Sequence, residues 1–557
     1  MPKPPLESIS RKSISHKDVE AFLSCPVKLD LLSKEVGPSD PEFVEGAALT
    51  DKILRPIHLS YLNKRHQVSA YNSELHDWDF LQTVTDSQVI LDWPISVDGY
   101  STKLDALMVA VSRAGKQILP VRFCAESKVT ELVRTLLCFD SLVLKLQFGY
   151  GPVEGLVVVG WEARSSNVTI TNTLQDRLNK CLKEIQCSQI ATPAVRLNRH
   201  CAVCQFQKHC LAEAQKADDL SLIMGMNAKE QDRMRNRGIF TVNQFSYTFR
   251  MRRNKRALSI AERRSHALTA LAIREQKTFV LGEPKFAFEV GDAFVDVEGD
   301  PSRGFYYLIG IAHYDHDEFI YRVLWADSAD EEGRIFRDFL GYLAEIGCKR
   351  IIHYGAFESE CFKQMLATHE LPPSTRESFQ SISNVNLLKT IYEHIYFPCR
   401  SNSLKEIGTK LGAVWRQPAS SGARANFWRL EWETTLNNSW KNKLVDYNED
   451  DCRALAVVAK AVANLSEGAA PKTQADSTDA PLEGLYSRGF ANEEFKAISR
   501  AAYWDRQRAL IYVGSNRKKS KTSRKKNTSL LKRPSRVLEV PLLISWAVGS
   551  FGGRPGA

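Results

Sequence analysis

The stretch "AFVDVEGDP", from Ala293 to Pro301, decides how the chain is interpreted because it places two acids inside an apolar run. Apart from Asp296 and Glu298, the run is typical of a buried β-strand. Side chains two residues apart in a strand point to the same face, so these two carboxylates project together. Burying like charges so close together is costly unless a cation lies between them. The pattern therefore predicts Mg²⁺ or Mn²⁺ at this pair, since both ions prefer carboxylate oxygens.

The surrounding sequence extends this strand into a sheet. "FAFEVGDAFVDVEGD", "GFYYLIGIAHYD" and "DEFIYRVLWA" follow one another across short turns with Gly or Asp, as in three antiparallel strands. A helix pattern, "DEEGRIFRDFLGYLAEIG", is followed by a strand, "KRIIHYG", and later by a long helix around "KNKLVDYNEDDCRALAVVAKAVANL". This order of elements predicts an RNase H-like α/β domain with a mixed sheet at residues 286–468.

Two further motifs supply acids to the same predicted domain. Glu358, in "HYGAFESECF", begins a helix at the carboxyl end of a strand, where such sheets bind ligands. In "DYNEDDC", Tyr447 and Asp451 are four residues apart and share a helix face. Asp446 and Asp450 form a second pair with the same spacing, so the spacing alone does not choose between them.

These motifs, in this order, resemble the DEDD superfamily of RNase H-like 3′–5′ exonucleases. That family carries D-x-E on the first strand, an acid after an aromatic on a middle helix, and Y-x-x-x-D on a late helix. A closer resemblance, to the YprB-like branch in RecB-like nucleases of bacteria, rests on "DVEGDPSRGFYYLIGI", "HYGAFE", "IYFPCRSNSLKEIGTKLG" and "YNEDDCRAL". The chain departs from the DEDD pattern at Glu358, where that family usually has aspartate.

The resemblance implies a metal-dependent nuclease that removes nucleotides from 3′ ends of DNA or RNA. In such sites two metal ions about 4 Å apart clamp the attacking and leaving oxygens of a phosphodiester. It implies that Asp296 bridges both ions and that Tyr447 orients the attacking water. The remaining ligands would be Glu298, Glu358 and Asp451.

A polar motif before a short helix, "SNSLKE", is a candidate for substrate binding. Ser401 and Lys405 would hold backbone phosphates of the nucleic acid. The alternative interpretation is a helix N-cap and a surface lysine.

Three cysteines in "HCAVCQFQKHC" have a spacing that suggests a metal. Three thiolates need a fourth ligand for a tetrahedral zinc site or a four-iron cluster. A histidine of the same motif, His200 or His209, would serve for zinc. Cys25, in "AFLSCPVKLDLL", is the alternative fourth ligand to Cys201, Cys204 and Cys210.

One cysteine near the start and three at the end of residues 1–215 resemble RecB-type nucleases with an iron–sulfur cluster, including the CRISPR-associated exonucleases and the AddB family. The resemblance implies a restriction-endonuclease-type α/β domain whose two ends are joined by a 4Fe–4S cluster. Zinc remains the alternative. We expect the cysteines to act as ligands rather than in disulfides, because the chain has features of a cytosolic protein.

The catalytic motif of that second resemblance is incomplete. RecB-like nucleases place an Asp on one strand and E-x-K on the next, and "STKLDALMVAV" supplies Asp105. The next strand, "KQILPVRF", has "PVR" at the expected place. A literal E-x-K lies just beyond, at Glu126 and Lys128, as a displaced motif or as surface charges on a turn. We expect a RecB-like fold that serves for DNA binding.

The remaining segments are a connector and a tail. Residues 216–285 are predicted as a helical connector, with a hairpin-like "MRNRGIFTVNQF" and a basic "FRMRRNKRALSIAERR". Residues 469–557 are predicted as a linker, a short helix and a basic, disordered tail. Arg517 to Arg536 contain ten Lys or Arg and no acid, which accounts for the whole net charge of +10. Such a run is a solvated segment or a phosphate-binding arm. The last residues, "VLEVPLLISWAVGSFGGRPGA", have the look of a truncated or shifted reading end.

Other protein classes fit the sequence less well. The N-terminus lacks a signal-peptide core and no apolar run approaches a membrane span, so we expect a cytoplasmic protein. No G-x-x-x-x-G-K-[ST] occurs, and a separate helicase is therefore a candidate partner, since many relatives of this architecture continue into a helicase. The D-x-E pair argues against a DDE-type transposase. The alternative to a nuclease is a catalytically weakened nucleic-acid-binding scaffold in DNA repair or mobile-element function.

Overall fold

The computed structural model describes most of the chain up to Glu467. The described residues are 13–72, 81, 84, 86–112, 115–188, 192–249, 264–417, 421–467 and 475–477. The predicted short helix and basic tail lie outside them, as do nearly all of the predicted linker and most of the basic stretch at 250–263. Among the described residues, no helix is both long and apolar enough to cross a membrane.

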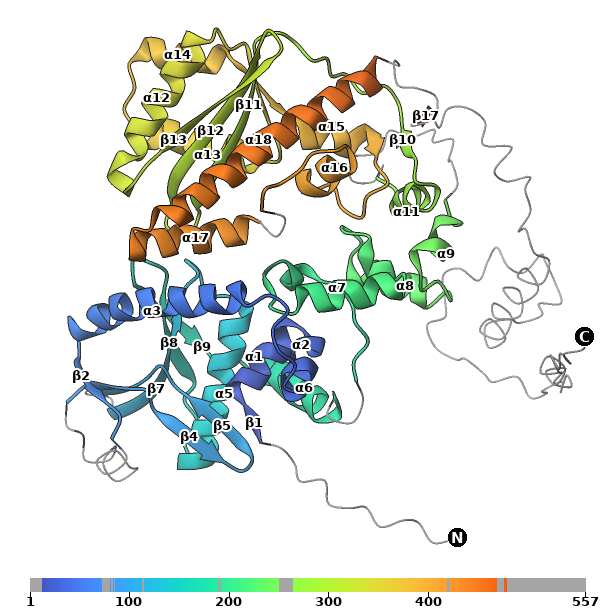
Figure 1. The fold of residues 1–557 in the computed structure, drawn as a ribbon. Coiled ribbons are helices and arrows are strands. Elements are labelled where there is room, and N and C mark those ends of the chain that lie inside the picture. Colours follow the sequence, from blue (N-terminus) through green and yellow to red (C-terminus); the bar gives the residue numbers. More distant parts are fainter. Residues whose placement is uncertain are drawn as a thin grey trace, which may run out of the picture. The chain divides into compact units, whose positions relative to one another are not determined.

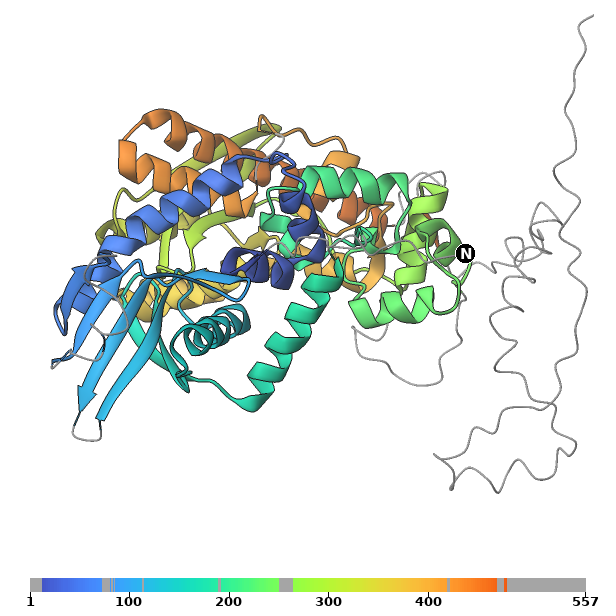
Figure 2. The ribbon, with the colours of Figure 1, turned by 90° about the horizontal axis from the view of Figure 1, so that it is seen from below.

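The N-terminal part of the chain contains two sheets. A six-stranded mixed sheet has the order β2-β3-β6-β7-β8-β9, and a small sheet has the order β1-β5-β4. Figure 2 shows α5, in teal, beside the blue strands, and α6 packs against α5. The strands are β1 (Ile14–Ser15), β2 (Gln67–Ala70), β3 (Gln88–Leu91), β4 (Pro94–Val97), β5 (Tyr100–Lys103), β6 (Ala106–Ser112), β7 (Gly115–Cys124), β8 (Glu154–Val159) and β9 (Arg164–Thr169). The helices are α1 (His16–Ser24), α2 (Pro26–Ser33), α3 (Glu42–Asn63), α5 (Glu131–Phe148) and α6 (Asn172–Ser188). This part is α/β, as predicted, while its RecB-like assignment remains a prediction.

A helical segment follows, with a small apolar core of its own. The turn of the predicted hairpin-like stretch, "GIFT", connects two short helices, α8 and α9. Each helix begins at a polar cap, Asn227 and Thr241 respectively. Its elements are η1 (Arg199–Val203), α7 (Gln207–Lys216), η2 (Leu220–Leu222), α8 (Ala228–Arg235), α9 (Val242–Ser246), α11 (His266–Glu275) and β10 (Thr278–Val280).

The C-terminal part of the described chain is built on a five-stranded sheet of order β13-β12-β11-β14-β15. The three predicted antiparallel strands are confirmed as β11 (Asp292–Asp300), β12 (Phe305–Asp315) and β13 (Glu318–Trp325). β14 (Arg350–His353) pairs in parallel with β11, and β15 (Ser383–Asn386) pairs in parallel with β14. The opening stretch of the sequence is therefore the central strand of the sheet (Figure 1).

The alternation of β11 separates its two faces. Ala293, Val295 and Val297 belong to one buried cluster, together with aromatic residues of α12 (Glu332–Glu345). Phe294 belongs to another cluster, together with residues of the long helix α18 (Asn438–Ser466). Because Asp296 has the same parity as Phe294, its side chain projects toward the α18 face. Figure 1 shows α18 running across this sheet.

The other elements of this part complete the layers around the sheet. The helices on the chain between β13 and β15 are η3 (Ala329–Glu331), α12, α13 (Phe357–Thr368) and α14 (Pro373–Ser381). After β15 come α15 (Leu387–His394), β16 (Ile395–Tyr396), α16 (Leu404–Lys410), α17 (Gly422–Thr435), α18 and β17 (Ala475–Ser477), and β10 pairs with both β16 and β17.

Candidate metal centre

Three carboxylates from two elements meet at one point of the C-terminal sheet. Asp296 and Glu298 come from β11, and Asp451 comes from α18. One oxygen of each lies within 4.8 Å of the others, and no other group of this kind is found among the described residues. Glu298 and Asp451 are buried, whereas Asp296 is half-buried. Asp296 and Glu298 are therefore joined by a third acid, Asp451, from a helix about 150 residues later in the chain.

Asn448 fixes the position of Asp296. Its side-chain amide donates to the backbone oxygen of Asp296 at 3.1 Å and to the carboxylate Oδ2 at 2.7 Å. The hydroxyl of Tyr321, on β13, donates to the amide oxygen of Asn448 at 2.9 Å. Asn448 is completely buried, so all of these bonds form away from solvent. They orient one carboxylate oxygen and leave the other one free for a ligand.

The amide reaches Asp296 because the opposite residue on β12 is a glycine. Gly310 pairs with Asp296 in the register of the two strands. A Cβ atom at Gly310 would lie 1.6 Å from Oδ1 of Asn448, a distance that no side chain could tolerate. Two residues further along β11, the register of the two strands shifts between Glu298 and Gly299. Such irregularities, of which β-bulges are the commonest kind, are often found beside active sites.

Asp451 is held by groups from three directions. The indole nitrogen of Trp415 donates to its Oδ1 at 2.6 Å. The hydroxyl of Tyr447, one helical turn earlier, also hydrogen-bonds to it, and the charge of Lys405 acts on it. The predicted proximity of Tyr447 to Asp451 on one helix face is therefore present in the structure.

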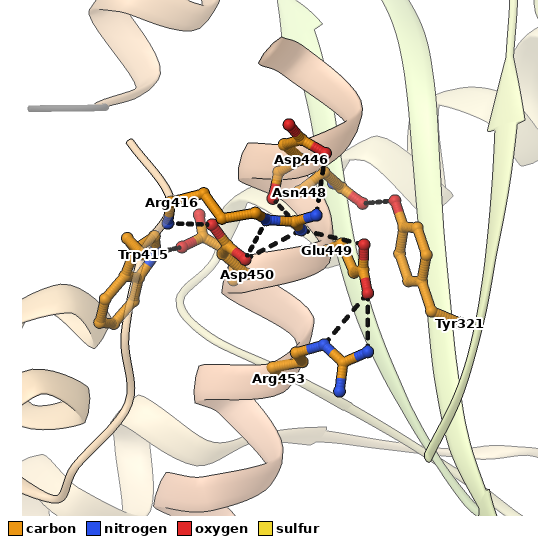
Figure 3. A network of polar contacts seen from close by, with 9 residues as sticks. Tyr321, Trp415, Arg416, Asp446, Asn448, Glu449, Asp450 and Arg453 are labelled. Atoms are coloured by element: carbon orange, nitrogen blue, oxygen red, sulfur yellow. Dashed lines mark hydrogen bonds and ion pairs between the residues drawn. The ribbon is translucent and has the colours of Figure 1, made fainter. Parts of the chain in front are cut away.

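The alternative pair, Asp446 and Asp450, shares one arginine as its cation. Arg416 contacts Asp450 through its backbone nitrogen at 2.7 Å and its Nε at 2.9 Å. The same guanidinium contacts Asp446 and Glu449, each at 2.9 Å, as Figure 3 shows. These acids thus have a protein cation as their partner, whereas Asp451 faces the other carboxylates.

Glu358 lies near this cluster without being part of it. It is buried in the first turn of α13, and its charge raises the pKa values of both Asp296 and Glu298. Its Oε2 lies 3.3 Å from Nδ1 of His353, at the end of β14. The structure therefore brings the fourth predicted acid close to the cluster, in contact with a histidine.

The repulsion between the carboxylates of the cluster favours the binding of a cation. Burial, followed by the charges of Asp451 and the other acids, raises the pKa values of Asp296 and Glu298 far above their ordinary range. Burial likewise raises the pKa of Asp451, to about 6, although its bonds from Trp415 and Tyr447 oppose this shift. A divalent cation would remove this repulsion, and hard oxygen ligands suit Mg²⁺ or Mn²⁺. The donor set therefore fits such an ion.

The two predicted phosphate-binding residues differ in their surroundings. The hydroxyl of Ser401 donates to Glu406 at 2.6 Å, and the backbone nitrogen of Ser401 contacts the same carboxylate. Ser403 caps α16. Lys405 lies with its ammonium 5.6 Å from the centre of the Trp415 ring, beside the carboxylate cluster, and burial lowers its pKa. Of the two, Lys405 is the one close enough to the cluster for the charge of Asp451 to act on it.

The four predicted cysteine ligands line one cavity. Cys25, at the junction of α1 and α2, faces Cys201, Cys204 and Cys210 there. His200 lines the same cavity, and its Nε2 is buried without a hydrogen-bond partner. Burial and the neighbouring thiols raise the pKa of Cys210 to about 12. The thiols do not approach one another as closely as the three carboxylates do.

The second predicted nuclease site has an internal ion pair at its centre. Arg122, the residue in place of the expected lysine, binds Asp140 of α5 at 2.6 and 2.7 Å, and both side chains are buried. Asp105 accepts from the backbone nitrogen of Phe123 at 2.9 Å. Glu126 and Lys128 are exposed on the bend after β7. Among the described residues, none of these acids joins a group of three metal ligands.

Several residues of the metal centre were not singled out from the sequence. Asn448 lies within the motif that supplied Tyr447 and Asp451, and its i, i+3 spacing to Asp451 places both on one helix face. Trp415 and Arg416 come from the loop before α17, and no local pattern links them to α18. Only the tertiary structure identifies them.

Comparison with known families agrees with this geometry. Residues 293–463 match the model of a family of the RNase H superfamily, a range that begins in β11 and ends in α18. This part of the chain is therefore an RNase H-like domain. Domains of this superfamily generally hydrolyse phosphodiester bonds of nucleic acids and use divalent metals, for which the carboxylate cluster is suited. A search of the curated proteins finds no match to the chain.

Proposed function

We propose that the chain is a 3′–5′ exonuclease that acts on DNA or RNA with two divalent metal ions, Mg²⁺ or Mn²⁺. The observation that carries this proposal is the group of three carboxylates within 4.8 Å, on the face of the sheet that α18 covers. With Glu358 nearby, four negative charges match the charge of two divalent ions. The order of the motifs along the sequence supports the DEDD-type assignment and its YprB-like branch.

The side chains around the cluster have separate roles in this proposal. Asp296, Glu298, Glu358 and Asp451 would hold the ions. When bound, the ions activate water and stabilise the charge that develops on the phosphate. Asn448 orients Asp296 through two bonds, and Trp415 fixes one oxygen of Asp451. The Tyr447 hydroxyl, held at Asp451, would orient the attacking water. Lys405 would contact the scissile strand from the same side.

Incubation with labelled nucleic acids tests this function. The purified chain, with Mn²⁺ or Mg²⁺, is given 5′-end-labelled single- and double-stranded DNA and RNA. We expect stepwise shortening from the 3′ end, inhibition by EDTA, and no shortening by Asp296→Ala. A substrate blocked at its 3′ end by a phosphorothioate linkage distinguishes exonuclease from endonuclease cleavage. Equal inactivity of both proteins on every substrate would favour the alternative, a catalytically weakened binding scaffold.

We also propose that Cys25, Cys201, Cys204 and Cys210 hold a 4Fe–4S cluster in a RecB-like domain. The common cavity supports this ligand set. A tetrahedral zinc ion, with Zn–S bonds of about 2.3 Å, would bring its sulfurs within about 4 Å of one another. A cluster of four irons accommodates thiols that lie further apart. Arg122 and Asp140 neutralise each other where the nuclease site of the first domain would lie. In this proposal the first domain therefore contributes DNA binding and no cleavage. A separate helicase is a candidate partner.

Purification without oxygen tests the cluster. We expect a brown protein with broad visible absorbance and about four irons per chain. Cys210→Ser should lose the colour and lower the melting temperature, whereas Cys187→Ser, at an exposed cysteine outside the cavity, should change neither. A colourless chain that contains one zinc ion would contradict the iron–sulfur assignment and support the zinc alternative.

A further inference from the structure

The contact between Glu358 and His353 has a specific geometry. Oε2 of Glu358 and Nδ1 of His353 are both buried and lie 3.3 Å apart, and neither atom has a well-formed hydrogen bond to any described residue. The side chains are 5% and 1% exposed, so water does not substitute for the contact. Burying two polar atoms in this way costs free energy unless the two atoms interact with each other.

Ser359 is a second neighbour of the His353 ring. Its Oγ lies 3.1 Å from Nε2 of His353, and the amide of Asn384 donates to the same Oγ at 3.4 Å. When the serine hydroxyl donates to Nε2, the ring proton is on Nδ1, facing Glu358. In that tautomer the imidazole can donate to the carboxylate.

The contact places one oxygen of Glu358 against His353 and leaves the other for an ion. Because Oε2 faces His353, Oε1 is the atom left to reach an ion beside Asp296, whose pKa the charge of Glu358 already raises. An aspartate at this position would be one methylene shorter and could not meet both the histidine and the ion. The contact with His353 therefore explains why this chain has a glutamate, rather than the aspartate of the DEDD pattern, at position 358.

We propose that His353 is a positioning residue for the second divalent ion: it fixes Glu358 so that Oε1 completes that ion's ligands. The inference rests on the proposed two-metal function and adds a determinant of metal occupancy to it. The first ion depends on Asp296, Glu298 and Asp451 and is independent of His353. Partners of ligating carboxylates typically contribute about 10–100-fold to metal affinity.

Titration of the full chain with Mn²⁺ tests this role, with free Mn²⁺ followed by electron paramagnetic resonance. We expect two bound ions in the unsubstituted chain. In His353→Leu the first ion should bind as before and the second about 10–100-fold more weakly. His353→Asn, whose amide N–H can take the place of Nδ1–H, should restore most of that affinity. Glu358→Asp should weaken the second ion, and adding His353→Leu to it should change little more.

A matched control and the contrary outcomes separate the alternatives. His369 makes a similar 3.0 Å contact with Glu332 in the same domain, and His369→Leu should leave Mn²⁺ binding unchanged. If both ions bind equally well to His353→Leu, the role of His353 is overturned and the nuclease proposal stands. If His353→Leu does not fold, His353→Asn decides the question. Loss of the second ion in that variant overturns the role of His353, and binding of the second ion supports it. If the unsubstituted chain binds no Mn²⁺, both proposals fail.

Discussion

Replacing Asp296 by asparagine is expected to abolish cleavage and, at the same time, to stabilise the metal-free protein. The rate should fall at least about 10³-fold, because the substitution removes a ligand that both ions would share. Stability at pH 7.5 should rise by about 1–3 kcal/mol, because one charge of a buried, repelling cluster disappears. The asparagine oxygen can still accept the bond from Asn448, so the packing of the site is kept.

The gain in stability should depend on pH in a defined direction. Folding raises the pKa of Asp296, chiefly through burial, so the folded protein binds its proton more tightly than the unfolded chain does. The contribution of Asp296 to the stability of the metal-free protein is therefore fully present below its ordinary pKa of about 4 and is lost as the pH rises through its folded-state pKa. Thermal melts in EDTA should show the advantage of Asp296→Asn at pH 7.5 and little of it at pH 4.

A second aspartate provides the matched control with the opposite sign. Asp450 is also buried, but it is bound by Arg416, so Asp450→Asn should destabilise the metal-free protein at pH 7.5. With saturating Mn²⁺, the unsubstituted protein should gain stability and Asp296→Asn should gain little. If Asp296→Asn melts below the unsubstituted protein in EDTA at pH 7.5, the carboxylates do not repel one another as proposed.

The sequence was sufficient to predict the sheet and most of the cluster because these features follow local rules. Alternation along β11 places Asp296 and Glu298 on one face, and helical spacing pairs Tyr447 with Asp451. The three antiparallel strands follow from short polar turns between apolar runs. The spacing alone did not choose between Asp451 and Asp450, and it was the resemblance to the DEDD pattern that implied Asp451.

Tertiary contacts that no local pattern encodes agree with that choice. Arg416, distant in sequence from α18, neutralises Asp450, and the adjacent Trp415 binds Asp451. The same limit applies to Glu358. Its partner His353 is close in sequence, but their contact cannot be predicted until the positions of β14 and α13 are known. Sequence patterns therefore identify candidate ligands, and the folded chain shows which of them already have a protein cation as partner.

Gly310→Ala is the second substitution with a large expected effect. The added Cβ would lie 1.6 Å from Oδ1 of Asn448 and 3.0 Å from the ring of Tyr321. Asn448 must therefore move away from Asp296, and the buried hydrogen bonds are lost. We expect a loss of about 2–4 kcal/mol in unfolding free energy and of most cleavage. Gly341→Ala, at an open position of α12, should be neutral or stabilising by up to about 1 kcal/mol.

A double-mutant cycle with Asn448→Ala shows whether the two residues act through the same contact. Asn448→Ala alone should cost about 1–3 kcal/mol, because it leaves polar atoms of Asp296 and Tyr321 without their partner. In that background the clash is absent, so Gly310→Ala should add much less than it does alone, as measured by urea denaturation. Fully additive losses would mean that the glycine serves another neighbour. A strongly non-additive pair would instead establish that Gly310 is needed because Asn448 must pass over it to hold Asp296, the central acid of the strand.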